Sequence, residues 1–154
     1  MKTNQRNGMI RLSVVAALVV LCLNFRPAIA QEATNLSFDD FKFKIKKGEK
    51  FEKSMIHSDI TKYEGKRIVI RGYIRPSFKQ NDLKQFILVR DNMECCFGPG
   101  AMLYDCMIVR MQKGKSTNFT VRPIAVEGEF KVREFKGPDG KPWAVYELKG
   151  ISVK

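Results

Sequence analysis

Three cysteines in the second half of the chain are the residues best suited to chemistry. Cys95 and Cys96 are adjacent, and Cys106 follows after a short segment. Thiolates are soft ligands that suit zinc or copper(I), and pairs of thiols can be oxidised to a disulfide. The segment Gly98-Pro99-Gly100 allows a turn that brings Cys96 towards Cys106. This region therefore predicts sulfur chemistry of one of three kinds, unless the thiols are buried and inert.

The three uses of these sulfurs remain open at the level of sequence. One is a structural disulfide from Cys106 to Cys95 or Cys96, with Cys96–Cys106 as the candidate pair. Such a bridge stabilises a fold by about 3 kcal/mol in the chain-entropy model. A second is a zinc or copper site formed by all three cysteines, with Asp105 or His57 as a fourth ligand. A third is a disulfide and one remaining thiol that serves redox exchange or an intermolecular link.

His57 is the only histidine of the chain. A hydrolase that relies on several histidines is therefore excluded, and a lone histidine is more often found at a helix start than in a site. Methionines beside the cysteines could add thioether ligands for copper(I). Met107 and Met111 are expected on a strand, however, where core packing explains them more simply. We expect a binding or accessory module rather than an enzyme.

The cysteine segment is positioned by predicted strands. Alternation of apolar and polar residues, punctuated by glycine and proline, predicts five strands. They are expected at residues 66–74, 85–90, 104–111, 123–135 and 143–153. Gly72 and Gly128 interrupt the first and fourth strands, as glycine does at a bulge or bend. Ser58 is expected to cap a short helix over residues 59–64, and residues 37–45 are expected to form a short helical turn or strand.

These elements predict a mainly β fold, a small five-stranded barrel with one or two short N-terminal helical segments. A sheet of this size closes to avoid long bare edges. Three patterns resemble the oligonucleotide/oligosaccharide-binding (OB) fold. They are Gly-Lys-x-Ile-x-Ile-x-Gly-x-Ile from Gly65, Phe-Ile-Leu-Val from Phe86 and Val-x-Gly-x-Phe-x-Val from Val126. Many OB folds place a helix between their third and fourth strands, but residues 112–118 are too few and too polar to form one.

The OB resemblance implies an aromatic face that stacks bases or sugars. The aromatic residues that could form such a face are Tyr73, Phe86, Trp143 and Tyr146. A domain of this size also needs aromatic side chains in its core, so core packing is the simpler expectation for these four residues.

The start of the chain has the three parts of a secretory signal peptide. Residues 2–11 contain three basic residues, residues 12–23 are apolar, and residues 28–30 read Ala-Ile-Ala, which fits the cleavage pattern. We expect export to the periplasm or the extracellular space, with an uncleaved signal that anchors the chain in the inner membrane as the alternative. The apolar run is shorter than the about 20 residues that span a bilayer, so we expect no transmembrane helix after cleavage.

Cleavage would divide the chain into a signal peptide (1–30), an N-terminal extension (31–56) with a flexible polar start at 31–36, and an OB-like β-barrel domain (57–154). The whole chain carries a formal net charge of +12, and the signal holds four basic residues and no acidic residue, which leaves +8. This charge favours an anionic surface polymer or an envelope protein as partner, unless it only solvates the surface. We expect no nucleic-acid partner, because an exported protein does not meet one.

The pattern from residue 65 to 76, the Phe-Ile-Leu-Val strand and the cysteine loop together resemble a family of bacterial exported domains described only as domains of unknown function. The resemblance covers roughly residues 57–153. In many members of that family the loop reads Cys-x-His followed by prolines, a pattern that suits a metal. In this chain Phe97 and Gly98 follow Cys96 instead. The resemblance implies a location in the bacterial periplasm or envelope.

Overall fold

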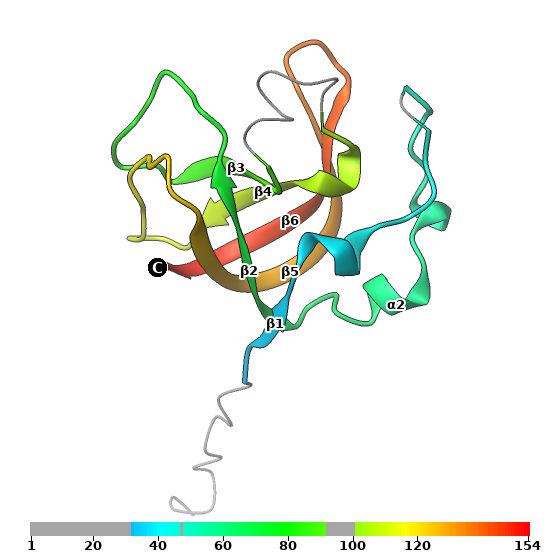
Figure 1. Cartoon of the computed structure of the whole chain (residues 1–154), viewed down its shortest axis with the longest axis horizontal. Coiled ribbons are helices and arrows are strands. Elements are labelled where there is room, and N and C mark those ends of the chain that lie inside the picture. The colour runs from blue at the N-terminus through cyan, green and yellow to red at the C-terminus, as the bar shows by residue number, and fades with distance from the viewer. Residues whose placement is uncertain (1–31, 47, 92–100) are drawn as a thin grey trace, which may run out of the picture. The chain divides into compact units, whose positions relative to one another are not determined.

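The computed structural model describes residues 32–46, 48–91 and 101–154 (Figure 1). Contacts divide the chain after Ala30, and all described residues belong to the unit from Gln31 to Lys154. The expected signal peptide lies outside the described residues. Within the described ranges, no helix is long and apolar enough to cross a membrane.

The described unit consists mainly of β-strands with a few short helical turns. The strands are β1 (Thr34–Leu36), β2 (Arg67–Ile74), β3 (Gln85–Val89), β4 (Cys106–Met111), β5 (Ile124–Lys136) and β6 (Pro142–Val153). The helical segments are η1 (Phe38–Phe41), η2 (Lys53–Met55), α2 (Ser58–Thr61) and η3 (Leu103–Asp105). The predicted mainly β class is confirmed, but the sheet has six strands rather than the five expected.

The strands form one sheet in the order β1-β2-β3-β4-β6-β5. In addition β2 pairs with β5, so the pairings run from β2 through β3, β4, β6 and β5 and return to β2. Four of these five pairings are antiparallel, and β4–β6 is parallel. Figure 1 shows how strongly the long strands β5 and β6 curve along their length.

The alternation along β2 has the orientation that the sequence predicts. Its isoleucines are buried, whereas Arg71 is exposed. Gly72 lies on the buried face, where a Cβ atom would stand 2.6 Å from the carbonyl oxygen of Val89 and 2.9 Å from the ring of Phe38. Glycine is required here because β3 and η1 approach the β2 backbone closely.

The predicted irregularity at Gly128 coincides with a shift of register between β5 and β6. Glu127 pairs with Ser152 of β6, but Gly128 pairs with Gly150, so one residue of β6 is skipped. A Cβ atom on Gly128 would lie 2.6 Å from the carbonyl oxygen of Lys149. The unpaired residue is Ile151, so the bulge lies on β6, opposite the Glu127–Gly128 step of β5.

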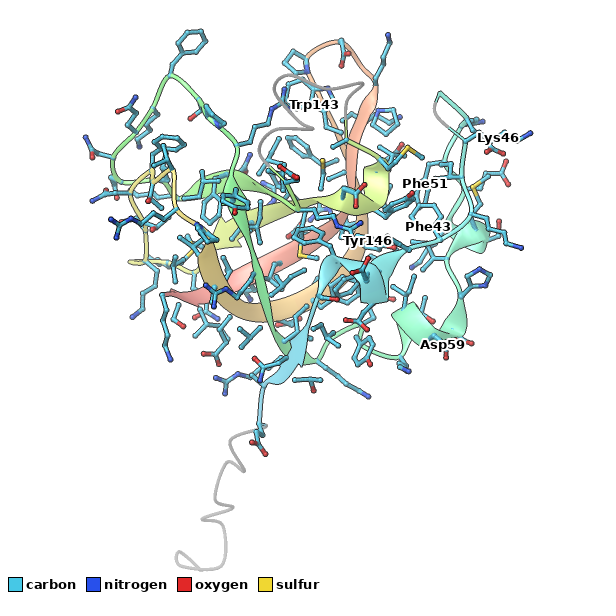
Figure 2. The ribbon with its side chains drawn as sticks, viewed as in Figure 1. Phe43, Lys46, Phe51, Asp59, Trp143 and Tyr146 are labelled. Atoms are coloured by element: carbon cyan, nitrogen blue, oxygen red, sulfur yellow. The ribbon has the colours of Figure 1, made fainter. Side chains whose placement is uncertain are left out.

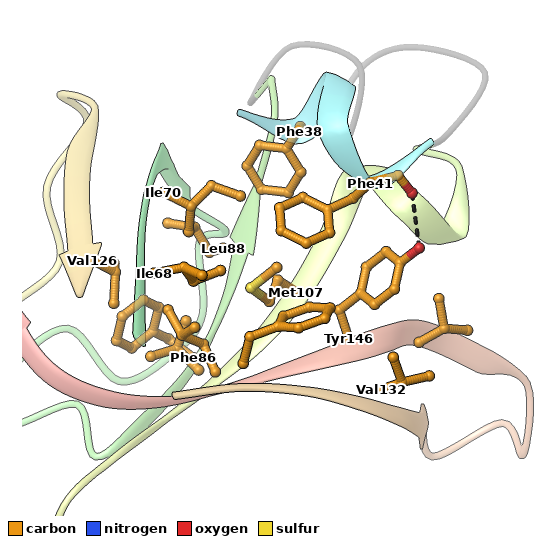
Figure 3. Close-up of a cluster of buried hydrophobic side chains, with 14 of the residues drawn as sticks. Phe38, Phe41, Ile68, Ile70, Phe86, Leu88, Met107, Val126, Val132 and Tyr146 are labelled. Atoms are coloured by element: carbon orange, nitrogen blue, oxygen red, sulfur yellow. Dashed lines mark hydrogen bonds between the residues drawn. The ribbon is translucent and has the colours of Figure 1, made fainter. Parts of the chain in front are cut away.

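Aromatic rings pack together in the core (Figure 3). The ring centroids of Phe41 and Phe130 are 4.9 Å apart, and each lies 5.4 Å from the ring of Tyr146. The Tyr146 hydroxyl donates a hydrogen bond of 2.8 Å to the main-chain oxygen of Phe41, and burial raises the pKa of Tyr146. Phe38 and Phe43 belong to the same core, so residues before position 57 contribute much of its aromatic content.

The expectation that residues 31–36 form a flexible start is wrong for Thr34–Leu36, which pair in parallel with Ile68–Ile70. The reason lies in the neighbouring strand. β3 pairs only with Tyr73 and Ile74 of β2, so the same edge of the first half of β2 remains open for β1. Residues 38–41 adopt the helical turn rather than the strand.

Two other boundaries differ from the sequence prediction. The short helix begins at Ser58 and ends at Thr61, with His57 rather than Ser58 at its N-cap position. The third predicted strand begins at Cys106, because residues 103–105 form η3. Short helices are held by few hydrogen bonds of their own, so small differences in packing move their ends.

Candidate functional site

The segment that carries the cysteines is closed at its base by the register pair Val89–Cys106. Cys106 begins β4, is only 7% exposed, and packs with Val89 and Ala144. Cys95 and Cys96 lie outside the described residues. The candidate Cys96–Cys106 disulfide and the three-cysteine metal site therefore stay predictions, with Cys106 fixed at the point where the loop returns to the sheet.

Asp105, one expected fourth ligand, is buried in an ion-pair network. Its carboxylate lies 3.3 Å from Nη1 of Arg90, and the main-chain N–H of Arg90 donates to the Asp105 carbonyl oxygen at 3.0 Å. Arg90 also donates to the carboxylate of Asp39 in η1. Hydrogen bonds from Lys42 and Arg90 hold the pKa of Asp39 below its ordinary value. The Asp105 carboxylate would thus have to break its ion pair with Arg90 before it could bind a metal.

His57, the other expected fourth ligand, is exposed at the start of α2. Its main-chain oxygen accepts hydrogen bonds from the N–H groups of Ile60 and Thr61, which fixes its backbone but not its ring. Across residues 32–46, 48–91 and 101–154, no three His, Cys, Asp or Glu side chains gather into a group that could hold a metal. Among the described residues, neither Asp105 nor His57 belongs to such a group.

A pocket of about 660 Å³ lies beside the end of the cysteine loop. Residues 45, 46 and 48–51 of the extension, residues 101–103 after the loop, and the β5–β6 hairpin form its walls. Its apolar lining consists of Ile45, Phe51, Ala101, Met102, Leu103 and Pro142. Its charged lining consists of Lys46, Glu49, Lys50, Glu134, Lys136 and Lys141.

The apolar wall of this pocket rests on the core. Phe51 is half-buried and its ring lies 6.0 Å from that of Phe43, which in turn lies 5.7 Å from the ring of Tyr104. Figure 2 shows Phe43 and Phe51 close together, with Lys46 further out on the same segment. Buried Phe43 therefore holds Phe51 in place from behind, which gives the pocket a fixed apolar surface.

Both carboxylates of the pocket already have partners. The carboxylate of Glu49 accepts a hydrogen bond of 2.7 Å from the main-chain N–H of Lys46, and that of Glu134 lies 3.8 Å from Nζ of Lys136. Within the part of the chain that the structure describes, no carboxylate pairs with the ammonium groups of Lys46, Lys50 or Lys141. The pocket thus combines an apolar wall with unneutralised positive charge, which suits an organic anion with an apolar body.

The four aromatic residues considered for a stacking face do not share one surface. Phe86 and Tyr146 are core residues, which confirms the expectation of core packing for these two. Tyr73 and Trp143 are half-buried, and the guanidinium of Arg75 lies 4.9 Å from the centre of the Trp143 ring. The aromatic face that the OB resemblance implies is therefore not formed by these four residues together: the core expectation holds for two of them, and the other two are half-buried.

Comparison with known proteins informs the fold. No family model and no curated protein matches the chain. The crystal structure of a DUF3299 family protein from Pseudomonas aeruginosa PAO1 matches with a TM-score of 0.56 and 18% sequence identity. The match covers 80% of this chain and 95% of that chain. The two chains share a fold. The likeness fits the expected resemblance to a domain-of-unknown-function family and carries no activity with it.

The pocket is what sequence reasoning missed. Lys46 and Lys50 belong to a lysine-rich stretch that is typical of a solvated turn, and nothing in the sequence places it beside the β5–β6 hairpin. The one available signal is the alternation of Phe41, Phe43 and Ile45 with lysines, which predicts that this segment has a buried side.

Proposed function

We propose that this chain is an exported, non-enzymatic binding module built on an OB-like barrel, with its ligand site at the pocket beside the cysteine loop. Two observations support the barrel. The strand pairings return to β2, and the order in which they do so, with one parallel pairing between β4 and β6, resembles that of OB folds. The basic start, apolar run and Ala-x-Ala pattern of residues 1–30 support export.

The observation that carries the proposal is the pocket of about 660 Å³ with its apolar wall and its lysines. Its volume is in the range of sites for small organic ligands. Lys50 and Lys141 line the pocket from two segments that are far apart in sequence, and Phe51 lies in its apolar wall. The ligand class is therefore an organic anion with an apolar part.

Calorimetric titration with dodecanoate tests this site, with dodecylammonium as the probe of equal length and opposite charge. We expect dodecanoate to bind and dodecylammonium to bind at least about tenfold more weakly, because the pocket lysines repel it. The double variant Lys50→Gln/Lys141→Gln should lose about tenfold in dodecanoate affinity. The matched control Lys44→Gln/Lys62→Gln removes two exposed lysines outside the pocket and should bind as the parent does.

The outcomes separate a site from general hydrophobic adsorption. Equal affinity for the two probes, or equal losses in the pocket and control variants, would mean that the pocket does not select anions. The Phe51→Ala variant should weaken the binding of both probes alike, because it removes apolar surface and no charge.

A metal or thiol function of the cysteines is the second candidate, and the position of Cys106 favours it. The Val89–Cys106 pair closes the loop that carries Cys95 and Cys96, so all three sulfurs belong to one loop and its base. Zinc or copper bound by the three cysteines is one form of this function, and thiol–disulfide exchange is the other. In the exchange form the attacking thiol would be Cys95 or Cys96, because Cys106 is almost fully buried.

Metal analysis and a thiol count on protein purified from the periplasm distinguish these forms. One equivalent of zinc or copper, lost in Cys106→Ser and in Cys96→Ser, supports a metal site. No metal with one reactive thiol supports exchange. No metal, one disulfide and an unreactive third thiol would contradict both. Thermal unfolding of each serine variant shows whether the loss reflects the ligand or the fold.

A further inference from the structure

The loops β2–β3 (75–84) and β4–β5 (112–123) are joined into one surface, which we name the paired loops. Leu83 and Thr117 exchange two main-chain hydrogen bonds of 2.7 and 3.1 Å. The N–H of Phe119 donates to the oxygen of Gln80 at 2.7 Å. Figure 1 shows the two loops on the same side of the sheet. Buried Leu83 anchors them to the core, so the surface is held in place.

Exposed apolar side chains concentrate on the paired loops. Among the described residues, Phe78 and Val121 are the large hydrophobic residues that stand out as exposed, with relative exposures of 111% and 74%. Phe78 sits in a turn where the hydroxyl of Ser77 donates to the oxygen of Lys79 at 2.8 Å. A phenylalanine held fully in water at a loop tip is an unfavourable arrangement unless another apolar phase receives it.

The same surface is strongly basic. Residues 75–84 and 112–123 contain six basic residues and one acidic residue. The basic residues are Arg75, Lys79, Lys84, Lys113, Lys115 and Arg122. The acidic residue, Asp82, lies 3.7 Å from Nζ of Lys84 and 3.9 Å from Nζ of Lys79. A hydrogen bond from Ser116 and these lysines lower the pKa of Asp82, which stays ionised and leaves a large positive excess.

A hollow of about 350 Å³ opens within this basic surface. Its charged and hydroxyl-bearing walls are Asp82 and Lys84 from one loop and Lys113, Lys115 and Ser116 from the other. Three lysines against one carboxylate leave the hollow with a net positive charge, which suits a phosphate ester. The hollow shares no lining residue with the pocket proposed as the ligand site.

We propose that the paired loops dock the protein on a membrane surface that contains anionic phospholipid. Phe78 enters the interfacial region of the bilayer, and Val121 contacts it. The lysines around the hollow bind lipid phosphates, and the remaining basic residues are attracted by the negative surface. An anionic membrane accepts both the exposed aromatic side chain and the basic side chains of this surface. An anionic polymer has no apolar phase into which Phe78 could insert.

Vesicle sedimentation with residues 31–154, which form a compact unit with their own core, tests the proposal. We expect binding to vesicles of phosphatidylcholine mixed with phosphatidylglycerol to exceed binding to pure phosphatidylcholine at least about tenfold, and to weaken with salt. Phe78→Ser should reduce binding several-fold without change in thermal stability, since the side chain is fully exposed. Lys113→Gln/Lys115→Gln should reduce binding about tenfold, and the control Lys44→Gln/Lys62→Gln should reduce it much less.

Phe78→Trp gives a direct readout of insertion. Its fluorescence, corrected for that of Trp143 in the parent, should shift to the blue when anionic vesicles are added and should stay unchanged with pure phosphatidylcholine. Equal binding to both vesicle types, or full binding by Phe78→Ser, overturns the proposal. Binding to soluble polyglutamate that matches vesicle binding and ignores the Phe78 substitution also overturns it, and identifies the surface as a polyanion site.

Discussion

The polar hydroxyl of Tyr146 lies inside an aromatic core, where it donates a hydrogen bond to the main-chain oxygen of Phe41. Tyr146→Phe should lower the free energy of unfolding by about 1–2 kcal/mol, because the Phe41 carbonyl then loses its buried partner. Chemical denaturation measures the change. Tyr73→Phe is the matched control, since no hydrogen bond of its hydroxyl is found among the described residues, and its effect should be small. Equal effects in both variants would show that the bond contributes little.

Glu127 on β5 and Arg67 on β2 form an ion pair diagonally across the two strands, because the register partner of Arg67 is Glu129. This ion pair should make stability depend on acid. Hydrogen bonds from Arg67 and Ser152, with the charge of Arg67, outweigh the effect of burial and hold the pKa of Glu127 below its ordinary value. A group whose pKa is lower in the folded state stabilises the fold above its unfolded-state pKa, and that stabilisation is lost as pH falls through the folded-state pKa. Glu127→Gln should therefore be less stable than the parent at neutral pH, with a difference that shrinks in acid.

Unfolding experiments at a series of pH values, from neutral to roughly pH 3, measure this difference. Glu129→Gln is the control on the same strand, because Glu129 pairs with its neighbour Lys131 at 3.1 Å on a more exposed part of the sheet. A gap between parent and Glu127→Gln that stays constant down to the lowest pH would contradict the role of the Glu127 carboxylate.

At the scale of elements, β2 is the strand on which the sheet depends, since it pairs with β1, β3 and β5. Gly72→Ala should destabilise the fold by about 2–3 kcal/mol, because the added Cβ would meet the Val89 carbonyl oxygen at 2.6 Å. Gly65→Asn is the control, at a left-handed position with open space around it, and should cost less than about 1 kcal/mol. Thermal unfolding compares the two. If Gly72→Ala leaves the thermal stability unchanged, β3 can shift away from β2 at little cost in free energy.

The five long strands could be predicted from sequence because alternation is a local signal. Each runs for enough residues to show which side is apolar, and Gly128 indicates where the register between β5 and β6 shifts. β1 could not be predicted in this way, because three polar or half-buried residues have no pattern of their own. Its existence depends on an open edge of β2, which is a property of the assembled sheet.

The candidate site was predictable only where a single segment carries the signal. The sequence placed Cys106 in a strand that follows the cysteine loop, and the structure shows that this strand begins at Cys106 itself, where Cys106 pairs with Val89. The pocket could not be predicted, because its walls come from three segments that meet only after folding. Asp105 shows the same limit, since its engagement with Arg90 depends on the register of β3 and β4.

At the scale of the whole molecule, the proposed functions lie on separate surfaces. The ligand pocket is built from the extension, the end of the cysteine loop and the β5–β6 hairpin, whereas the paired loops lie at the ends of β2, β3, β4 and β5. Substitutions in one surface should therefore leave the other unaffected, because effects at separate sites without shared partners add independently. Lys50→Gln/Lys141→Gln should bind anionic vesicles with most of the parent's affinity, and Phe78→Ser should bind dodecanoate as the parent does.

The N-terminal segment belongs to the folded unit, and its removal should be far more damaging than its position suggests. Phe41 is fully buried, and Phe38 and Phe43 are nearly so, all within the core that β2 to β6 surround. A chain that begins at residue 46 would lose these three rings, the partner of the Tyr146 hydroxyl and the edge strand β1 at once. Each lost phenylalanine alone corresponds to about 3–5 kcal/mol, and small domains are stable by only about 5–15 kcal/mol.

We expect residues 46–154 to show no cooperative thermal transition and to bind a hydrophobic dye, whereas residues 31–154 unfold cooperatively. A chain that begins at residue 34 is the control, because it keeps β1 and all three phenylalanines and should unfold like the longer form. A cooperative transition in residues 46–154 would show that strands β2 to β6 suffice for folding. In that case the extension would pack on a sheet that folds without it, and the Tyr146 hydroxyl would form its hydrogen bond with another group.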